Sequence, residues 1–457
     1  MKSKPDSRLY CSLEKIKTLL IFILFICLIL MCFAYVNIRY KNLAVSIPKF
    51  EDNYKMVISK NTGGSNLNNS DLISPVFIGI SSGKSKKACS YDNGTNYAVW
   101  SDIKQYAAEL FQNPGTIMEF SDELSRTSYI NNILSGYDYI FFTFGNDIPA
   151  QCFVPFILNK PSVVQNPFYV RSLIMSVDKN NTLFGIAIDS DGNIAQLYSS
   201  DKTSVTNEKL YAYTNIAQMP NFEIQYVNGV PVPVFSETIY INTAKISSFS
   251  EILNENNAEI VSDILKSFSF NPNNTKFYTA LDGSVTYVEN EGDITITKNG
   301  EITFASLPSS GIPIYDILKS QNHTYSFSDK LFASEQILSG LCNFYFTKDA
   351  KITLDTCTYD DGILSVNFIY TISGIPVSKE FGYAKFDFDD SSIVGAKIYP
   401  LIAEISDKKT SDVPQNLMLA LIKDSLSGKG AYSFLPKYSD YENDGSSIQA
   451  YFAVDAK

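Results

Sequence analysis

The 457-residue chain carries a net charge of −11 at neutral pH, and its 45% hydrophobic and 19% charged content is typical of a folded protein. The first 17 residues hold five basic and two acidic side chains, so −14 remains on the rest. This acidic balance disfavours binding to nucleic acid or anionic wall polymers, and it favours a protein partner or a cationic or neutral ligand.

A run of 21 uncharged residues, 18–38, predicts a transmembrane helix, since at ~1.5 Å per residue it spans roughly 30 Å. Five basic residues precede this run, whereas only Arg39 and Lys41 follow it closely. The positive-inside rule therefore predicts a cytoplasmic tail at 1–17 and an extracellular remainder. No small-x-small cleavage site follows the run, so we expect a retained signal-anchor in the cell membrane.

The stretch 39–74 is predicted to be a linker, because it ends in an Asn-, Ser- and Gly-rich tract. Residues 75–235 are predicted to form an N-terminal α+β domain. Its expected elements are a strand at 76–80, helices at 100–111 and 121–134, a strand at 137–144, a helical stretch at 149–158, and three strands from Ser172 with a hairpin turn at Asp191-Gly192.

A middle domain is predicted over 236–310, with a strand at 238–241 and helices at 249–253 and 258–268. Four short strands follow, separated by three turn-forming dipeptides, Asp282-Gly283, Glu291-Gly292 and Asn299-Gly300, which predict an antiparallel meander.

The C-terminal α+β domain, 311–457, is expected to repeat this order of helices followed by a meander. Its predicted helices are 314–318, 329–341 and one starting near Pro414, and its predicted strands are 351–358, 363–373, 376–388, 392–399, 432–436 and 448–454. The last two strands are expected to complete the sheet of this domain. The predicted fold is thus α+β, with one transmembrane helix and a multi-domain extracytoplasmic region of helices packed on antiparallel meanders.

Seven cysteines fall into two groups. Cys11, Cys27 and Cys32 lie in or before the predicted membrane helix, whereas Cys89, Cys152, Cys342 and Cys357 lie outside, where disulfides can persist. Free buried thiols are favoured, because domains of this size need no covalent links. The pairs Cys342–Cys357 and Cys89–Cys152 stay open as alternatives.

The residues that could carry chemistry do not assemble an active site. His323 is the only histidine, which excludes a multi-histidine zinc site, and its neighbours indicate a surface loop. Gly83-Lys84-Ser85 resembles the end of a phosphate-binding loop, but Ile78 occupies the position of the required earlier glycine.

Two acidic patterns have equally ordinary explanations. Asp189, Asp191 and Asn193 have the spacing of a calcium loop, but Ile194 replaces its glycine, so a hairpin turn is favoured. Alternation places Asp387 and Asp389 on the exposed face of a strand. We therefore expect no catalytic residue, no metal, no cofactor and no enzymatic activity.

Several phrases resemble the YycH family, membrane-anchored accessory proteins of the WalK/WalR (YycG/YycF) cell-wall two-component system of low-GC Gram-positive bacteria. The first is the start of the predicted anchor, Lys15-Ile16-Lys17-Thr18-Leu19-Leu20, and the second is the strand Phe141-Phe142-Thr143-Phe144 followed by Ile148-Pro149. The third lies in the middle domain and consists of Phe270-Asn271-Pro272, Asp282-Gly283 and Gly300-Glu301-Ile302. The fourth, Ile372-Ser373-Gly374-Ile375-Pro376-Val377, is similar to a strand pair shared with the sister YycI family. The final strands, with Gln449-Ala450-Tyr451-Phe452, depart from the aromatic-rich ending of YycI-type sheets.

The resemblance implies a regulator of a sensor histidine kinase that acts with a YycI-like sister protein through transmembrane and ectodomain contacts. Within the membrane helix, the smaller side chains of Cys27, Cys32 and Ala34 are the candidates for close helix packing, with lipid-facing filler as the alternative. Two other functions stay open: a wall- or peptide-binding ectodomain without a kinase partner, and a carboxylate-based surface hydrolase.

Overall fold

The computed structural model describes residues 72–83, 85–89, 91, 95–113, 115–158, 160, 162, 164, 168–202, 219–247, 258–308, 310–319, 325–345, 350–378, 383–399, 402–411, 432–441 and 447–456. Every described residue belongs to one compact unit, residues 52–457. All ladders between the described strands are antiparallel, which confirms the predicted α+β class with antiparallel sheets.

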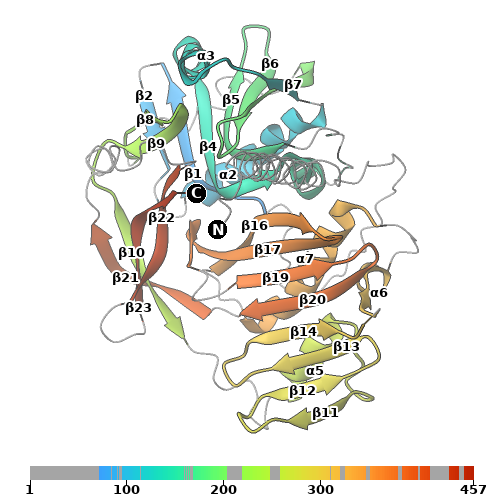
Figure 1. The fold of residues 1–457 in the computed structure, drawn as a ribbon. Helices are drawn as coiled ribbons and strands as arrows, with labels where there is room; N and C mark the ends of the chain where they lie inside the picture. The colour runs from blue at the N-terminus through green and yellow to red at the C-terminus, as the bar shows by residue number, and fades with distance from the viewer. Residues whose placement is uncertain are drawn as a thin grey trace, which may run out of the picture. The chain divides into compact units, whose positions relative to one another are not determined.

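A seven-stranded sheet forms the N-terminal part of this unit (Figure 1). In spatial order it contains β2 (Ser85–Ala88), β1 (Pro75–Ser82), β4 (Tyr139–Pro149), β5 (Tyr169–Val177), β6 (Thr182–Ile188), β7 (Ile194–Lys202) and β3 (Thr116–Met118). Its central strands bury side chains on both faces: adjacent Phe141 and Phe142 on β4 are both fully buried. Both faces must therefore be covered by other elements.

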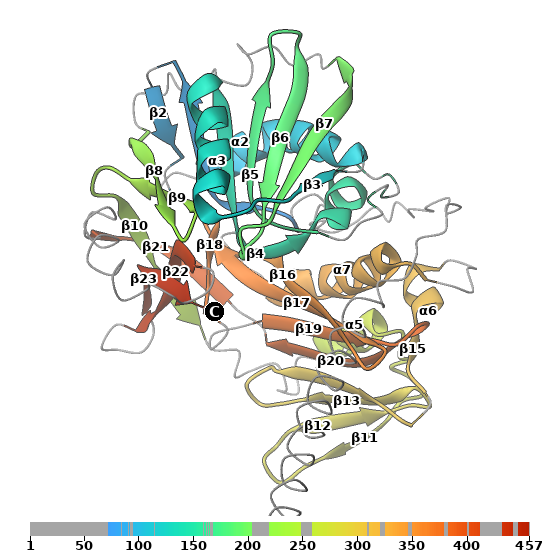
Figure 2. The same cartoon turned by 45° about the horizontal axis from the view of Figure 1, so that its top comes forward.

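Helices supply much of that cover. In Figure 2, α3 (Glu123–Gly136) lies in front of the sheet and α2 (Thr95–Glu109) behind it. Asp122 caps α3, because its carboxylate accepts a hydrogen bond from the Ser125 N–H at 2.7 Å. The predicted helical stretch at 149–158 consists of two short turns, η3 (Ala150–Cys152) and η4 (Val154–Leu158), while η2 (Leu110–Gln112) extends α2.

A hairpin missing from the sequence prediction packs beside this sheet. It consists of β8 (Phe222–Val227) and β9 (Val230–Phe235), joined by a turn at Asn228-Gly229. Arg126 of α3 donates to the Asn228 carbonyl at 2.7 Å and to the Gly192 carbonyl of the β6–β7 turn at 3.2 Å. One arginine thus ties two turns to the same helix.

A ten-stranded sheet follows. Its main path is β11 (Lys276–Thr279), β12 (Val285–Val288), β13 (Gly292–Ile296), β14 (Ile302–Ser306), β20 (Ser392–Tyr399), β19 (Tyr383–Phe388), β17 (Ile363–Ile372) and β16 (Ala350–Asp360), with β15 (Ile312–Pro313) on β20 and β18 (Ile375–Pro376) on β17. The predicted meander β11–β14 is present with its three turns. Because β14 pairs with β20, strands from the predicted middle and C-terminal domains form one sheet.

Three helices pack on one side of this sheet: α5 (Ala258–Ser267), α6 (Ile314–Leu318) and α7 (Phe327–Tyr345) (Figure 2). Helix α7 begins with a reciprocal cap, because the Ser326 N–H donates to the Asp329 carboxylate at 2.8 Å and the Asp329 N–H donates to Ser326 Oγ at 3.2 Å. This cap starts the helix two residues before the predicted position.

The last two strands do not complete the ten-stranded sheet, so that prediction is wrong. They belong to a separate four-stranded sheet of β21 (Ile402–Ser411), β10 (Tyr240–Ser247), β23 (Ser447–Ala456) and β22 (Tyr432–Tyr441). Strand β10 was expected to open the middle domain, but it pairs with two strands from the end of the chain. Strand β21 had not been predicted at all.

Among the described residues, no helix combines the length and the apolar character that crossing a bilayer requires. The predicted membrane helix at 18–38 and its packing candidates Cys27, Cys32 and Ala34 lie outside the described residues, as do the predicted helices at 249–253 and after Pro414. The linker lies outside them too, except for its last three residues, which the structure describes in detail.

Candidate functional site

The three large sheets meet around one small cavity of about 50 Å³. We call the surrounding residues the joint: Ser74, Val76, Gly145, Asn146 and Ile148 of the seven-stranded sheet and its entry, Thr353, Leu354, Asp355, Ile369 and Pro376 of the ten-stranded sheet, and Leu435, Pro436 and Lys437 of the four-stranded sheet. Because residues from all three sheets line the same cavity, a change in how the sheets pack must change the joint.

A chain of polar groups crosses the joint. Strand β4 bulges between Thr143 and Ile148, and the bulge turns Asn146 toward β16. The Asn146 amide donates to the carboxylate of Asp355, and its oxygen accepts a hydrogen bond from the Arg171 guanidinium at 3.2 Å. Asp355 is 1% exposed and Arg171 is 8% exposed. Charge-assisted hydrogen bonds between groups this deeply buried are strong, so this chain fixes the seven-stranded sheet against β16.

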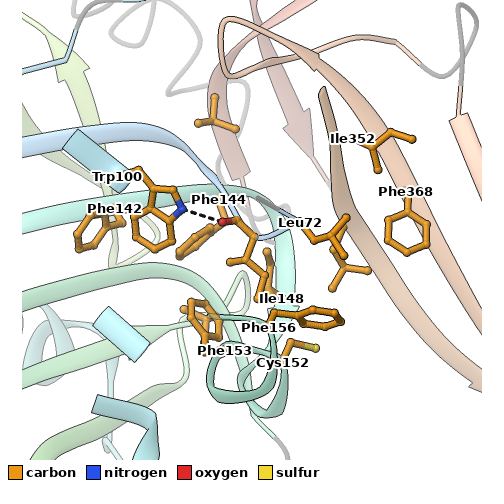
Figure 3. Packing of buried hydrophobic residues seen from close by; sticks show 14 of the residues in the cluster. Leu72, Trp100, Phe142, Phe144, Ile148, Cys152, Phe153, Phe156, Ile352 and Phe368 are labelled. Atoms are coloured by element: carbon orange, nitrogen blue, oxygen red, sulfur yellow. Dashed lines mark hydrogen bonds between the residues drawn. The ribbon is translucent and has the colours of Figure 1, made fainter. Parts of the chain in front are cut away.

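The segment that precedes β1 is hydrogen-bonded both to the ten-stranded sheet and to helix α2, which covers the seven-stranded sheet. Leu72 and Ile73 are almost fully buried, and the Leu354 N–H of β16 donates to the Leu72 carbonyl at 2.8 Å. From the other side, the indole N–H of Trp100 donates to the Ile73 carbonyl at 2.8 Å (Figure 3). Figure 3 also shows Leu72 reaching toward Ile352 and Phe368 of the ten-stranded sheet. We call residues 72–76 the tether, because they join the predicted linker to the joint.

Asn96 of α2 extends this hold along the tether. Its side-chain amide is within hydrogen-bonding distance of the carbonyls of Pro75 and Val76, at 3.1 and 3.2 Å. The turn between β17 and β18 reaches the same amide: a Cβ built on Gly374 would lie 3.0 Å from the Asn96 nitrogen. Gly374 has a φ of +82°, a backbone conformation that favours glycine. The close approach of Asn96 also leaves little room for a side chain at this position.

The four-stranded sheet is bonded to the joint through β22. The Ser378 N–H donates to the Tyr438 carbonyl at 2.7 Å, next to an isolated parallel bridge between Val377 and Tyr438. The buried Tyr438 hydroxyl donates to the Asn242 carbonyl of β10 at 2.6 Å. Tyr438 therefore connects the end of the ten-stranded sheet with two strands of the four-stranded one.

The size of the cavity limits what the joint can do. Pockets for small organic ligands measure roughly 300–1,000 Å³, whereas a water molecule needs only about 10–15 Å³ of comparable space. A cavity of about 50 Å³ has room for a few waters but is too small for an organic substrate. The arrangement of buried polar groups and shared main-chain bonds suits a mechanical connection between sheets.

The other candidates from the sequence do not lie at the joint. Gly83 forms the β1–β2 hairpin turn, and its N–H donates to Asp138 at 2.7 Å. Asp189 accepts hydrogen bonds from the N–H groups of Asp191 and Asn193 at 2.9 and 2.8 Å, which confirms the predicted hairpin turn. Burial raises the pKa of Asp189, and the hydrogen bonds from Asn193 oppose this effect.

The carboxylates after β19 have structural partners. Asp387 lies 3.0 Å from the Lys385 ammonium and accepts a hydrogen bond from Ser365. Asp389 accepts from the N–H groups of Ser391 and Ser392 at 2.8 and 2.6 Å and so stabilises the turn into β20. Within the part of the chain that the structure describes, no three His, Cys, Asp or Glu side chains are grouped so as to hold a metal ion. His323 lies outside that part.

Three of the four cysteines that follow the predicted membrane helix are free and buried: Cys89, Cys152 and Cys357. Neither alternative disulfide is therefore formed, since each would use at least one of these thiols. Burial raises the pKa of all three thiols, which disfavours the reactive thiolate. The side chain of Cys342 is outside the described part.

No motif in the sequence marks the joint. Asn146 lies between the strand predicted at 137–144 and the helical stretch predicted at 149–158, and Asp355 lies in the predicted strand 351–358 without any motif. One local signal existed: a charged residue inside an otherwise apolar-alternating strand is rarely buried without a partner. Which partner it meets could not be read from the sequence, because Asn146 lies 209 positions away.

Comparison with solved structures finds a likeness of fold. No family model matches the chain, and no curated protein matches it. Among solved structures, the crystal structure of YycH from Bacillus subtilis matches with a TM-score of 0.55, covering 86% of this chain and 98% of that one. The sequences are 10% identical, so the likeness is one of fold. The chain thus has a YycH-like fold.

Proposed function

We propose that this protein is a membrane-anchored, extracytoplasmic accessory protein that regulates a sensor histidine kinase of a cell-wall two-component system. The observation that supports this proposal is the YycH-like fold, which extends over 86% of the chain. The short sequence phrases that resemble the YycH family and the predicted anchor at 18–38 point in the same direction. In this proposal the protein is not an enzyme, and it acts together with a YycI-like sister protein.

Regulation of this kind requires no catalytic group. It requires that the accessory protein bind one state of the kinase more tightly than another, because a ligand shifts an equilibrium only by its difference in affinity. A helix packed beside the kinase helices and an ectodomain docked on the kinase can both contribute to that difference. The three sheets and the joint would give the docked ectodomain a defined shape.

A membrane pull-down tests the proposal. The full chain is compared with a variant whose residues 18–38 are replaced by poly-leucine, and with a second variant that changes only the packing candidates (Cys27→Leu, Cys32→Leu and Ala34→Leu). All three chains keep an apolar helix of equal length. The proposal expects a histidine kinase to co-purify with the unaltered chain.

The variants locate the contact. Loss of the kinase in both variants assigns the contact to the small side chains of the helix, and loss only with poly-leucine assigns it to the rest of the helix. Retention in both assigns the contact to the ectodomain. Absence of a kinase in all three samples would contradict the proposal and favour a wall- or peptide-binding protein.

A further inference from the structure

We propose that the tether, residues 72–76, couples the membrane anchor to the joint, so that release of the tether loosens the packing of the sheets and loosening of the joint releases the tether. This inference goes beyond the proposed function, and only its reference to the anchor rests on it. The coupling itself is a property of the described residues.

The tether is hydrogen-bonded on both sides, to the ten-stranded sheet and to a helix of the seven-stranded sheet. Its carbonyls accept hydrogen bonds from Leu354 of the ten-stranded sheet and from Trp100 on the helix behind the seven-stranded sheet. A tether lying only on the seven-stranded sheet could move with that sheet and leave the other unaffected. Because the tether is hydrogen-bonded to both Leu354 and Trp100, it cannot follow one sheet without affecting the other. When the sheets separate, at least one of these hydrogen bonds must break.

The tether is also deeply buried. Leu72 is 1% exposed and Ile73 is 0% exposed, so withdrawing them leaves apolar space between the sheets. Cores do not close over such space without cost, because their packing is close to that of crystals. The tether is therefore part of the core that holds the sheets together, although its first three residues, 72–74, are the end of the predicted linker.

The tether also lies next to the chain of polar groups that crosses the joint. Ser74 and Val76 line the same cavity as Asn146 and Asp355, and the Leu354 amide that holds Leu72 directly precedes Asp355 in the chain. The β16 bulge falls between Leu354 and Thr356, so the residue that receives the Asn146 hydrogen bond is the bulged one. Movement of the tether thus acts on the strand position that fixes the two sheets.

Hydrogen exchange followed by mass spectrometry tests this coupling on the purified full chain in lipid nanodiscs. The tether variant is Leu72→Ala with Ile73→Ala. The matched control is Ile264→Ala with Leu265→Ala on α5, which removes the same side chains from equally buried positions away from the joint. We expect the tether variant to speed exchange in β4 and β16 on the order of tenfold or more, with β11–β14 unchanged. The control should leave β4 unchanged.

The reverse direction uses Asn146→Ala, because coupling between two sites is reciprocal. This variant should speed exchange in residues 72–76, which Asn146 does not hydrogen-bond. Trp100→Phe provides a milder release of the tether, since it keeps an aromatic ring and loses only the hydrogen bond to Ile73.

Faster exchange confined to the tether in its variants, or confined to β4 and β16 in Asn146→Ala, would overturn the proposal. These measurements contain no kinase, so their failure is distinguishable from the failure of the proposed function. Conversely, the reciprocal changes in hydrogen exchange are expected even if no kinase co-purifies with the chain in the pull-down.

Discussion

The joint and the meander β11–β14 are built in opposite ways. In the meander each strand pairs with the next one in sequence, through turns in which Gly283 and Gly300 adopt φ values of +82° and +81°. At the joint, Asn146 and Asp355 meet across 209 positions of sequence. Closing short loops loses little chain entropy, whereas contacts between distant segments form only after most of the chain is ordered. The meander can therefore be stable locally, while the joint depends on the whole unit.

The largest effect is expected from Asn146→Ala. The substitution removes hydrogen bonds to two buried charged side chains, and its expected cost is about 3–4 kcal/mol. Trp100, the only tryptophan, donates to the tether beside the joint, so its fluorescence during urea unfolding reports this loss directly.

The control is Asn290→Ala, an exposed residue between β12 and β13, which should change stability by less than about 0.5 kcal/mol. Equal effects of the two substitutions would show that the polar chain does not hold the sheets together.

The next largest change in the free energy of unfolding is expected at two glycines that flank β17. Gly362 and Gly374 flank this strand with φ values of +83° and +82°, so alanine strains both by roughly 1–2 kcal/mol. A Cβ on Gly362 meets nothing within 4 Å, whereas one on Gly374 lies 3.0 Å from the Asn96 amide. Gly374→Ala should therefore cost roughly 1 kcal/mol more. Equal shifts in the urea midpoint would mean that the Asn96 side chain moves aside at no cost. Its hydrogen bonds to the tether would then contribute little to stability.

The same contrast explains what the sequence could predict. The dipeptides ending in Gly283, Gly292 and Gly300 specify the meander by local turn chemistry, and Asp122 specifies the start of α3 by local capping. No local rule pairs β10 with β21 and β23, or Asn146 with Asp355, because these partners are chosen by packing across the whole unit. The candidate site was therefore missed although the elements carrying it were mostly found.

The helical layer on the ten-stranded sheet should respond to pH. Burial raises the pKa of Glu335 on α7 to about 7, and its hydrogen bond from Ser339 opposes the rise only in part. A carboxyl group with a raised folded-state pKa favours folding when protonated. This contribution is fully present below the unfolded pKa near 4.5 and is lost as the pH rises through about 7.

We expect about 2 kcal/mol of stability to be lost between pH 5.5 and 8.5, and Glu335→Gln to remove this dependence. Urea unfolding followed by circular dichroism at several pH values provides the measurement. An unchanged pH profile in Glu335→Gln would assign the dependence to other groups.

The smallest effect tests whether the meander is locally independent. Thr286 and Thr295 are cross-strand partners on β12 and β13, with their hydroxyl oxygens 2.9 Å apart. Thr295→Val removes one hydroxyl and leaves the buried Thr286 hydroxyl without this partner, at a cost of about 0.5–1 kcal/mol. Replacing both by valine should be nearly neutral, because no polar group is then left behind and valine suits a strand.

Such a rescue is possible only where the pair is self-contained. At the joint, changing both Asn146 and Asp355 to leucine would still remove the amide oxygen that accepts a hydrogen bond from the buried Arg171 guanidinium, so the double variant should stay destabilised. Hydrogen exchange in β12–β13 and Trp100 fluorescence measure the two regions separately. A meander pair that failed to recover, or a joint pair that did, would remove the distinction between a locally and a globally stabilised region.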